Sequence, residues 1–388
     1  MRLFGSVILI VGLSTALTAA AFAIFFAITR HVRVALGFAV GAVFAYSAQC
    51  GLGFATTHST SLSGLVQPAA GPSPIVVPSP RPSPGSQRFR ELAIPAPGGN
   101  PYALTFGSDH SIWFTESECT SGIGRLNADG TWRHWPITDG CNAQPLAITI
   151  GSDGNVWFAD VWNAYGRITS DGKLTRFTMP EASYPSGITA GPDGDLWIAA
   201  GSPYSKPFIA QVGTDGTVVS LHRLSAQAGE PRGIVTGPDG AIWFTESAGI
   251  GRLTTSGELT EFPLPQGNGS GSPYQIAVGP DRNLWFIEYL PSGDGRIGRL
   301  TPSGRLTEFV APGARGLQWI AAGPDNALWF TAADVIGRIT LSGAVSVFTI
   351  PTYRAQPVGI AMGPDKNMWF AEAFGGVGGD IGVFTVKS

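Results

Sequence analysis

The chain has 388 residues, more than one ordinary domain needs, and its 53 glycines, 30 prolines and 11 tryptophans are typical of a turn-rich all-β protein. The formal net charge is only -3, and the 24 basic residues are scattered singly. A nucleic-acid-binding protein usually carries a concentrated basic patch, so we expect no nucleic-acid partner.

The first 55 residues are apolar enough to enter a membrane. Residues 3–29 form an uncharged apolar run, and a second run spans residues 34–55. A helix as long as the first run, rising about 1.5 Å per residue, crosses a hydrocarbon core of about 30 Å. Arg30, His31 and Arg33 lie between the runs and favour a cytoplasmic connector. Residues 1–55 are therefore predicted to form a membrane anchor, a hairpin of two helices, with the rest of the chain extracytoplasmic.

An export signal is the alternative interpretation of this segment. Residues 34–49 provide an apolar core with small residues near its end, as a cleaved signal needs. Cys50 is a candidate lipid-attachment site, although Gln49 before it is bulkier than such signals usually carry. Under this alternative the protein is secreted or lipid-anchored, and the C-terminal part still crosses the membrane.

Residues 56–87 are rich in Pro, Ser and Gly and include the run P-S-P-I-V-V-P-S-P-R-P-S-P at 72–84. Proline fixes φ and removes a backbone donor, so this composition builds no core. We expect an extended, semi-stiff linker between the membrane segment and the next domain.

Residues 88–388 consist of one unit repeated seven times. Each copy has a Gly-(Pro or Ser)-Asp turn, and a tryptophan follows the glycine by six residues, with 40 to 46 residues between successive tryptophans. The tryptophans are Trp113, Trp157, Trp197, Trp243, Trp285, Trp329 and Trp369. This period, with four short strand-like runs per copy, predicts a β-propeller in which the tryptophans fill the space between adjacent sheets.

The last copy ends directly after its third strand, whereas the first copy has a strand to spare. Residues Arg88–Pro95, R-F-R-E-L-A-I-P, match the outer-strand pattern E-L-T-E-F-P-L-P of Glu258–Pro265 but precede the first inner strand. We therefore predict an all-β, seven-bladed β-propeller whose ring is closed by this N-terminal strand, which pairs an otherwise open edge. Such a closed ring is expected to be a monomer.

The repeats G-P-D-G-x-L-W-F-T-E, I-G-R-L-T-x-S-G and L-T-E-F-P-L-P resemble those of the virginiamycin B lyase family, also called streptogramin lyases, over residues 88–388. The resemblance implies ring opening of a cyclic depsipeptide by elimination across its ester, with Mg²⁺ and a histidine base. The positions where the family carries its histidines hold Tyr274 and Leu290, so no catalytic residue is assigned. Three histidines of the repeat region, His110, His134 and His222, are expected to be solvated scaffold residues.

Two sets of equivalent residues are expected to border the central channel on one face. The first ring follows the start of each inner strand and varies between blades: Tyr102, Leu146, Ser186, Arg232, Tyr274, Gln318 and Val358. The second ring ends each second strand: Glu116, Asp160, Ala200, Glu246, Glu288, Ala332 and Glu372. Because the blade itself does not dictate a variable position, we predict ligand binding by Tyr102, Arg232, Tyr274, Gln318 and Glu288.

The acidic ring has a structural interpretation as well. The third strands carry arginines in five blades, four of which also carry the acid, which predicts an ion pair between the two in each of these blades. Glu372 faces Val383 instead of an arginine, and Glu288 stands near Tyr274. These two are the candidates for binding Mg²⁺, which takes one or two carboxylates plus waters.

Cys119 and Cys141 are expected in neighbouring blades on the same face, where an oxidising compartment permits a disulfide. Two free thiols are the alternative. For function, two hypotheses remain open: a membrane-tethered propeller that binds a small or peptidic ligand at its channel, and a Mg²⁺-dependent lyase with a base other than histidine.

Overall fold

The computed structural model describes residues 88–95, 99–117, 122–137, 143–202, 205–225, 229–265, 271–290, 293–373 and 379–387. The predictions for residues 1–55 and 56–87, and for Cys119 and Cys141, lie outside these ranges. Within the ranges, no helix has the length and apolar character that crossing a membrane requires.

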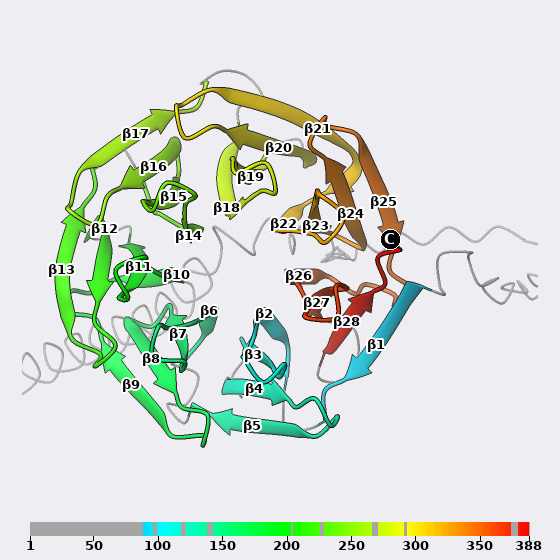
Figure 1. Ribbon diagram of the computed structural model, residues 1–388, viewed down its shortest axis with the longest axis horizontal. Helices are drawn as coiled ribbons and strands as arrows, with labels where there is room; N and C mark the ends of the chain where they lie inside the picture. Colours follow the sequence, from blue (N-terminus) through cyan, green and yellow to red (C-terminus); the bar gives the residue numbers. More distant parts are fainter. Residues whose placement is uncertain are drawn as a thin grey trace, which may run out of the picture. The chain divides into compact units, whose positions relative to one another are not determined.

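The described chain folds into seven four-stranded antiparallel sheets arranged in a ring (Figure 1). Each blade is listed here from its inner to its outer strand. Blade 1 consists of β2 (Pro101–Phe106), β3 (Ile112–Glu116), β4 (Gly122–Leu126) and β5 (Trp132–Pro136), and blade 2 consists of β6 (Pro145–Ile150), β7 (Val156–Asp160), β8 (Ala164–Ile168) and β9 (Leu174–Thr178). Blade 3 consists of β10 (Tyr184–Ala190), β11 (Leu196–Ser202), β12 (Ser205–Val212) and β13 (Val218–Arg223), and blade 4 consists of β14 (Ile234–Thr236), β15 (Ile242–Glu246), β16 (Gly249–Leu253) and β17 (Leu259–Pro263). Blade 5 consists of β18 (Ser272–Val278), β19 (Leu284–Tyr289), β20 (Asp294–Leu300) and β21 (Leu306–Arg315), and blade 6 consists of β22 (Leu317–Ala322), β23 (Ala327–Ala332), β24 (Val335–Thr340) and β25 (Val345–Thr349).

Blade 7 confirms the predicted closure of the ring. It consists of β26 (Pro357–Met362), β27 (Met368–Glu372), β28 (Asp380–Phe384) and, at its outer edge, β1 (Phe89–Ala93). β1 runs antiparallel to β28, with Phe89 opposite Phe384 and Leu92 opposite Ile381. The Phe89 ring meets the Phe384 ring edge to face at 5.0 Å between centroids. The two ends of the propeller are thus joined in one sheet.

The repeated turn depends on close packing of its first glycine. At Gly237 a Cβ atom would overlap the Trp243 ring and the Asp239 carboxylate. That carboxylate accepts a hydrogen bond from Trp243 Nε1 at 2.9 Å. The fourth turn residue has φ near +60° to +90°, which glycine adopts without strain, as at Gly240. The motif therefore fixes both the turn and the tryptophan.

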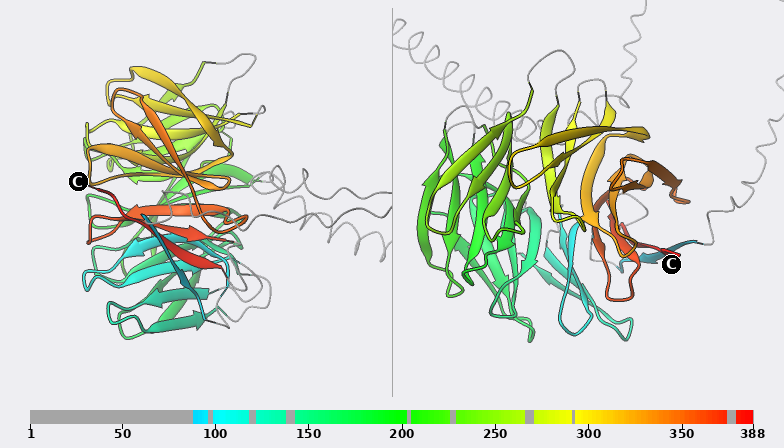
Figure 2. Two further views of the ribbon diagram at one scale, coloured as in Figure 1. Left: turned by 90° about the vertical axis from the view of Figure 1, so that its right-hand side faces the viewer. Right: turned by 45° about the horizontal axis from the view of Figure 1, so that its top comes forward.

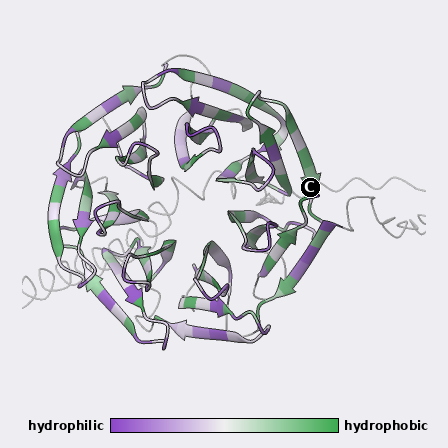
Figure 3. Cartoon of the chain, viewed as in Figure 1, coloured by the Kyte–Doolittle hydropathy of each residue, from purple (hydrophilic) through white to green (hydrophobic). Residues whose placement is uncertain are grey.

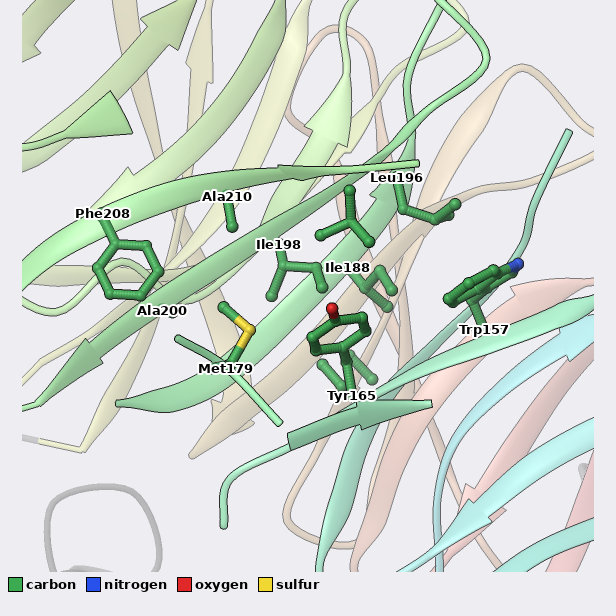
Figure 4. Packing of buried hydrophobic residues seen from close by; sticks show 12 residues of the cluster. Trp157, Tyr165, Met179, Ile188, Leu196, Ile198, Ala200, Phe208 and Ala210 are labelled. Atoms are coloured by element: carbon green, nitrogen blue, oxygen red, sulfur yellow. The ribbon is translucent and has the colours of Figure 1, made fainter. Parts of the chain in front are cut away.

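Each tryptophan packs between neighbouring blades, as predicted. Figure 4 shows the cluster between blades 2 and 3, where Trp157 and Tyr165 meet Ile188, Leu196 and Ile198. Trp157 is fully buried and stacks on Phe177 of β9 at 6.0 Å. The side views of Figure 2 show the sheets standing side by side around the ring. The outer strands alternate hydrophilic and hydrophobic segments (Figure 3), because one face of each packs inward.

Candidate functional site

The first ring of residues sits at irregularities of the inner strands. In six blades the pairing register of the inner strand shifts around the ring position, for example between Pro101 and Leu104 and between Pro273 and Ile276. In blade 4, Arg232 precedes the short strand β14. A bulge reorients a side chain relative to the regular alternation of a strand. The irregularities therefore account for side chains that leave the blade packing and reach into the channel.

Tyr102 and Tyr274 meet although 172 residues separate them in sequence. They belong to β2 and β18, on opposite sides of the ring (Figure 1). Their hydroxyl oxygens are 3.2 Å apart, within hydrogen-bond distance. Burial, followed by the neighbouring Tyr274, raises the pKa of Tyr102 well above 10. The pair is thus a hydrogen-bonded bridge across the channel.

Arg232 and Trp319 complete this central cluster. The Arg232 guanidinium carbon lies 5.4 Å from the centre of the Tyr274 ring, and Arg232 Nη2 lies 3.6 Å from Glu230 Oε2. Trp319 packs edge to face against Tyr102, with 6.2 Å between centroids. Trp319 was not among the predicted residues, and its only sequence signal is that an aromatic residue directly follows the ring position of blade 6.

The structure brings together three of the predicted ligand-binding residues, Tyr102, Arg232 and Tyr274. Gln318 is half-buried, and its link to this cluster is that it precedes Trp319 in β22. Glycines next to the ring allow adjacent inner strands to approach closely. A Cβ at Gly233 would lie 2.8 Å from the Tyr274 carbonyl oxygen, and one at Gly359 would lie 2.6 Å from that of Tyr102. The inner strands of adjacent blades are therefore in backbone contact beside Tyr102 and Tyr274.

The predicted pairing of the acidic ring with the third-strand arginines is wrong. The arginines pair instead with the aspartates of the repeated turns, at the other end of the strands. Arg252 Nε lies 2.7 Å from Asp239 Oδ2, and Arg338 Nε lies 2.5 Å from Asp325 Oδ2. The same pairing joins Arg125 to Asp109, Arg167 to Asp153 and Arg299 to Asp281. The reason is the register, in which each arginine lies opposite the tryptophan and not opposite the acid, as for Trp243 and Arg252.

The acidic ring also does not border the channel. Its carboxylates are at most 4% exposed and lie across the third strand toward the outer strand of their own blade. In blade 1, Glu116 Oε2 is 2.7 Å from His134 Nε2, and in blade 2, Asp160 Oδ2 is 2.8 Å from Arg176 Nη2. In these two blades a nitrogen-bearing side chain of the outer strand lies against the buried acid.

Three other blades place a second acid opposite the first. Burial, and after it the neighbouring Glu261, raises the pKa of Glu246 to about 7. Burial likewise raises the pKa of Glu288 to about 7, with Arg296 opposing and Glu308 adding to the shift. In blade 7, burial, Glu91 and Asp380 together raise the pKa of Glu372 to about 8. Buried carboxyls of this kind hold a proton near neutral pH.

The acids selected as Mg²⁺ ligands do not fit the ion. Glu288 Oε2 already has a cation nearby, since Arg296 Nε lies 3.4 Å away. Glu372 is completely buried, whereas Mg²⁺ usually keeps several of its waters. Over the described ranges, no group of three or more His, Cys, Asp or Glu residues is arranged to hold a metal ion. We therefore derive no step through Mg²⁺ at these positions.

The histidines of the repeat region differ from the expected solvated scaffold residues. His110 is exposed, as expected. His134 lies against Glu116, as described above, and His222 stacks on Trp197 at 5.4 Å between ring centroids. Burial lowers the pKa of His222, and Ser220 Oγ lies 2.8 Å from its Nε2. Both are on outer strands, at the periphery of the ring.

Comparison with known proteins places the fold and the repeat in one family. The model of the virginiamycin B lyase family matches residues 87–247 and 203–387. A streptogramin B lyase structure is 31% identical, with a TM-score of 0.68 over 79% of this chain and 100% of that one. Virginiamycin B lyase from Staphylococcus aureus is 34% identical, with a TM-score of 0.68 over 77% and 99%.

A catalytically inactive histidine variant of the S. aureus enzyme has a structure with quinupristin. The extracellular domain of a two-component-system protein from B. thetaiotaomicron, 13% identical with a TM-score of 0.58 over 76% of this chain and 42% of that one, shares the fold only. No curated protein matches the chain. With the family model covering both halves of the propeller, the chain belongs to the virginiamycin B lyase family.

Proposed function

We propose that this protein is a membrane-tethered, extracytoplasmic propeller that binds a small or peptidic ligand at its channel mouth. The observation that supports the proposal is the cluster of Tyr102, Tyr274 and Arg232, which converges from three blades on one point of the channel. None of the three is a packing residue that the repeat requires, because other blades carry Leu146, Ser186 or Val358 at the same position.

The chemistry of the cluster suits a compact peptidic ligand. Phenol hydroxyls donate to and accept from amides, and the aromatic faces of Tyr274 and Trp319 offer apolar contact. The Arg232 side chain is 25% exposed, and among the described residues its ion-pair partner is Glu230, at 3.6 Å. Its remaining donors are suited to carbonyl or carboxylate oxygens of the ligand.

Quinupristin is the probe for this proposal, because it is the ligand in the structure of a related protein. We expect calorimetric titration of the full-length protein to show one binding event, and Arg232→Gln to weaken it about 10-fold or more, the value of one charged hydrogen bond. Arg305→Gln, which removes an exposed charge from the outer edge of blade 5, is the matched control and should bind as the parent does. Absence of binding, or an equal loss in both variants, would contradict the proposal.

A lyase acting on the same class of ligand is the second candidate. It is favoured by the family match and by Tyr274, whose hydroxyl lies in the channel cluster and whose ring has the Arg232 guanidinium at 5.4 Å, a cation that favours the ionised form of a base. Elimination opens the ester without adding atoms, so the linear product has the mass of the substrate. We expect chromatography with mass spectrometry, after incubation with a type B streptogramin and Mg²⁺, to show this isobaric product for the parent and none for Tyr274→Phe. Equal conversion by both proteins would exclude Tyr274 as the base, and no conversion by either would leave the binding proposal alone.

A further inference from the structure

Aromatic rings on the outer strands seal the junctions between successive blades. In each of blades 1 to 5, the outer-strand ring stacks on the tryptophan of its own blade, as Phe262 does on Trp243 at 5.4 Å. The same ring reaches the glycine in the last turn of the next blade, so that a Cβ at that glycine would touch it. These contacts pair Trp135 with Gly172, Phe177 with Gly216, His222 with Gly257, Phe262 with Gly304 and Phe309 with Gly343.

The junction between blades 7 and 1 lacks this ring. The equivalent residue is Leu92 of β1, which lies opposite Ile381 just as Phe262 lies opposite Ile250. The equivalent glycine of blade 1 is Gly130, and a Cβ there would have nothing within 4 Å. Trp369 is 8% exposed, whereas the tryptophans of the other six blades are 0 to 3% exposed. Space that a ring fills elsewhere is therefore open here.

This space forms a cleft of about 490 Å³ between the two blades. Leu92 and Trp369 line one side, and Phe106, Trp132 and Gly130 of blade 1 line the other. Trp132 occupies a position that other blades fill with leucine, namely Leu174, Leu259 and Leu306, and still leaves the cleft open. The volume falls in the range of sites that hold small organic ligands.

The rim of the cleft carries Arg90, Asp365 and His110, and Arg90 is placed to bind an anion beside the Trp369 ring. Arg90 lies over the Trp369 ring, with its guanidinium carbon 5.6 Å from the centroid, and it is exposed. No described residue forms an ion pair with Arg90, unlike the third-strand arginines, which turn aspartates hold. Asp365, the turn aspartate of blade 7, already accepts hydrogen bonds from Trp369 Nε1 at 3.0 Å and Asn367 Nδ2 at 2.9 Å. Arg90 is thus an arginine of the rim that no acid among the described residues holds.

We propose that this cleft is a binding site for a small planar aromatic carboxylic acid. The ring of the ligand stacks on Trp369 where the other blades place a ring of their own, and Arg90 binds the carboxylate. The site lies at the seam where β1 closes the propeller, away from the Tyr102–Tyr274 cluster, and does not depend on the function proposed above.

Indole-3-acetate is the probe for this site, titrated into the full-length protein and followed by ligand-detected NMR. A fragment of this size is expected to bind with a Kd of about 1 mM. Its neutral analogue indole-3-acetamide, and indole-3-acetate with Arg90→Gln, should each bind about 10-fold more weakly, because a charged hydrogen bond is lost. No binding of the acid, or equal binding of acid and amide, would overturn the proposal.

The decisive variant is Leu92→Phe, which places in blade 7 the ring that the other blades have. It should abolish binding of the acid and raise Tm by about 2 °C, since it buries apolar surface in existing space. The matched control is Phe262→Leu, which removes such a ring from blade 4. It should lower Tm and leave binding at the seam unchanged. Undiminished binding by Leu92→Phe, or a lower Tm for that variant, would show that the cleft does not hold an aromatic ring against Trp369.

Discussion

A chain that begins at Gly99, and therefore lacks β1, is expected to lose cooperative unfolding and to aggregate, whereas one that begins at Arg88 stays monomeric. β1 contributes the backbone pairing from Phe89 to Ala93 along β28 and buries apolar groups, including Ile94, which is 5% exposed. Together these interactions are on the order of 10 kcal/mol, comparable with the whole stability of a domain. Their loss also exposes β28 as an unpaired edge. Calorimetry and light scattering on the two chains provide the measurement.

Restoration in trans separates this closure effect from a general effect of truncation. A synthetic peptide of residues 88–95 should pair with β28 and restore the monomer, whereas the same peptide with Phe89→Ala should do so less well, because the Phe89 ring contacts Phe384 and Phe370. Unfolding of the shorter chain at the same temperature as the longer one, without peptide, would show that β1 does not close the ring.

The closure could be predicted from sequence because it is a matter of counting. Seven tryptophans at a regular period define the blades, and the strand Arg88–Pro95 has the outer-strand pattern without a blade of its own. The ion pairs could not be predicted in the same way. Blades 1, 2, 4 and 5 each offer their third-strand arginine two acids, one in the turn and one at the far end of the second strand. Only the strand register decides between them, as when Trp113 pairs with Arg125 and Glu116 with Gly122.

For the candidate site, too, the sequence predicts which residues take part but not which contacts they make. The repeat indicates which residues stand at the ring position, since Tyr102 and Tyr274 occupy equivalent places in their copies. That their hydroxyls meet depends on bulges in two inner strands and on the width of the channel, neither of which has a sequence signal. The outer-strand partners of the acids had a signal that was overlooked. In blades 4 and 7 the Ile-Gly of the third strand leaves the acid free to lie over the glycine, so Glu246 Oε1 and Glu372 Oε1 approach the places where side chains of Gly251 and Gly382 would start.

Blades 4, 5 and 7 carry buried acids whose ionised form is destabilised in the folded state, and these acids make the stability of the fold depend on pH. Glu372 is the strongest case: neither of its carboxylate oxygens has a hydrogen-bond partner among the described residues, and its neighbours Glu91 and Asp380 are also acids. Its pKa rises from 4.5 to about 8 on folding. The folded state thus binds a proton between these pH values that the unfolded state releases.

Stability is accordingly expected to fall as pH rises from about 4.5 to about 8, and Glu372→Gln is expected to reduce that fall. The contribution of the protonated carboxyl is fully present below pH 4.5 and is lost by about pH 8, a difference on the order of 4 kcal/mol. Glutamine keeps the shape without the titration, so the variant should be more stable than the parent at pH 9 and close to it at pH 5, by urea unfolding. The slope flattens without vanishing, because Glu246 and Glu288, with pKa values raised to about 7, act in the same direction. Asp160→Asn, which removes a buried acid that already pairs with Arg176 at 2.8 Å, should give no gain at pH 9. Parallel curves for the parent and Glu372→Gln would mean that Glu372 is ionised in the folded ring throughout this range.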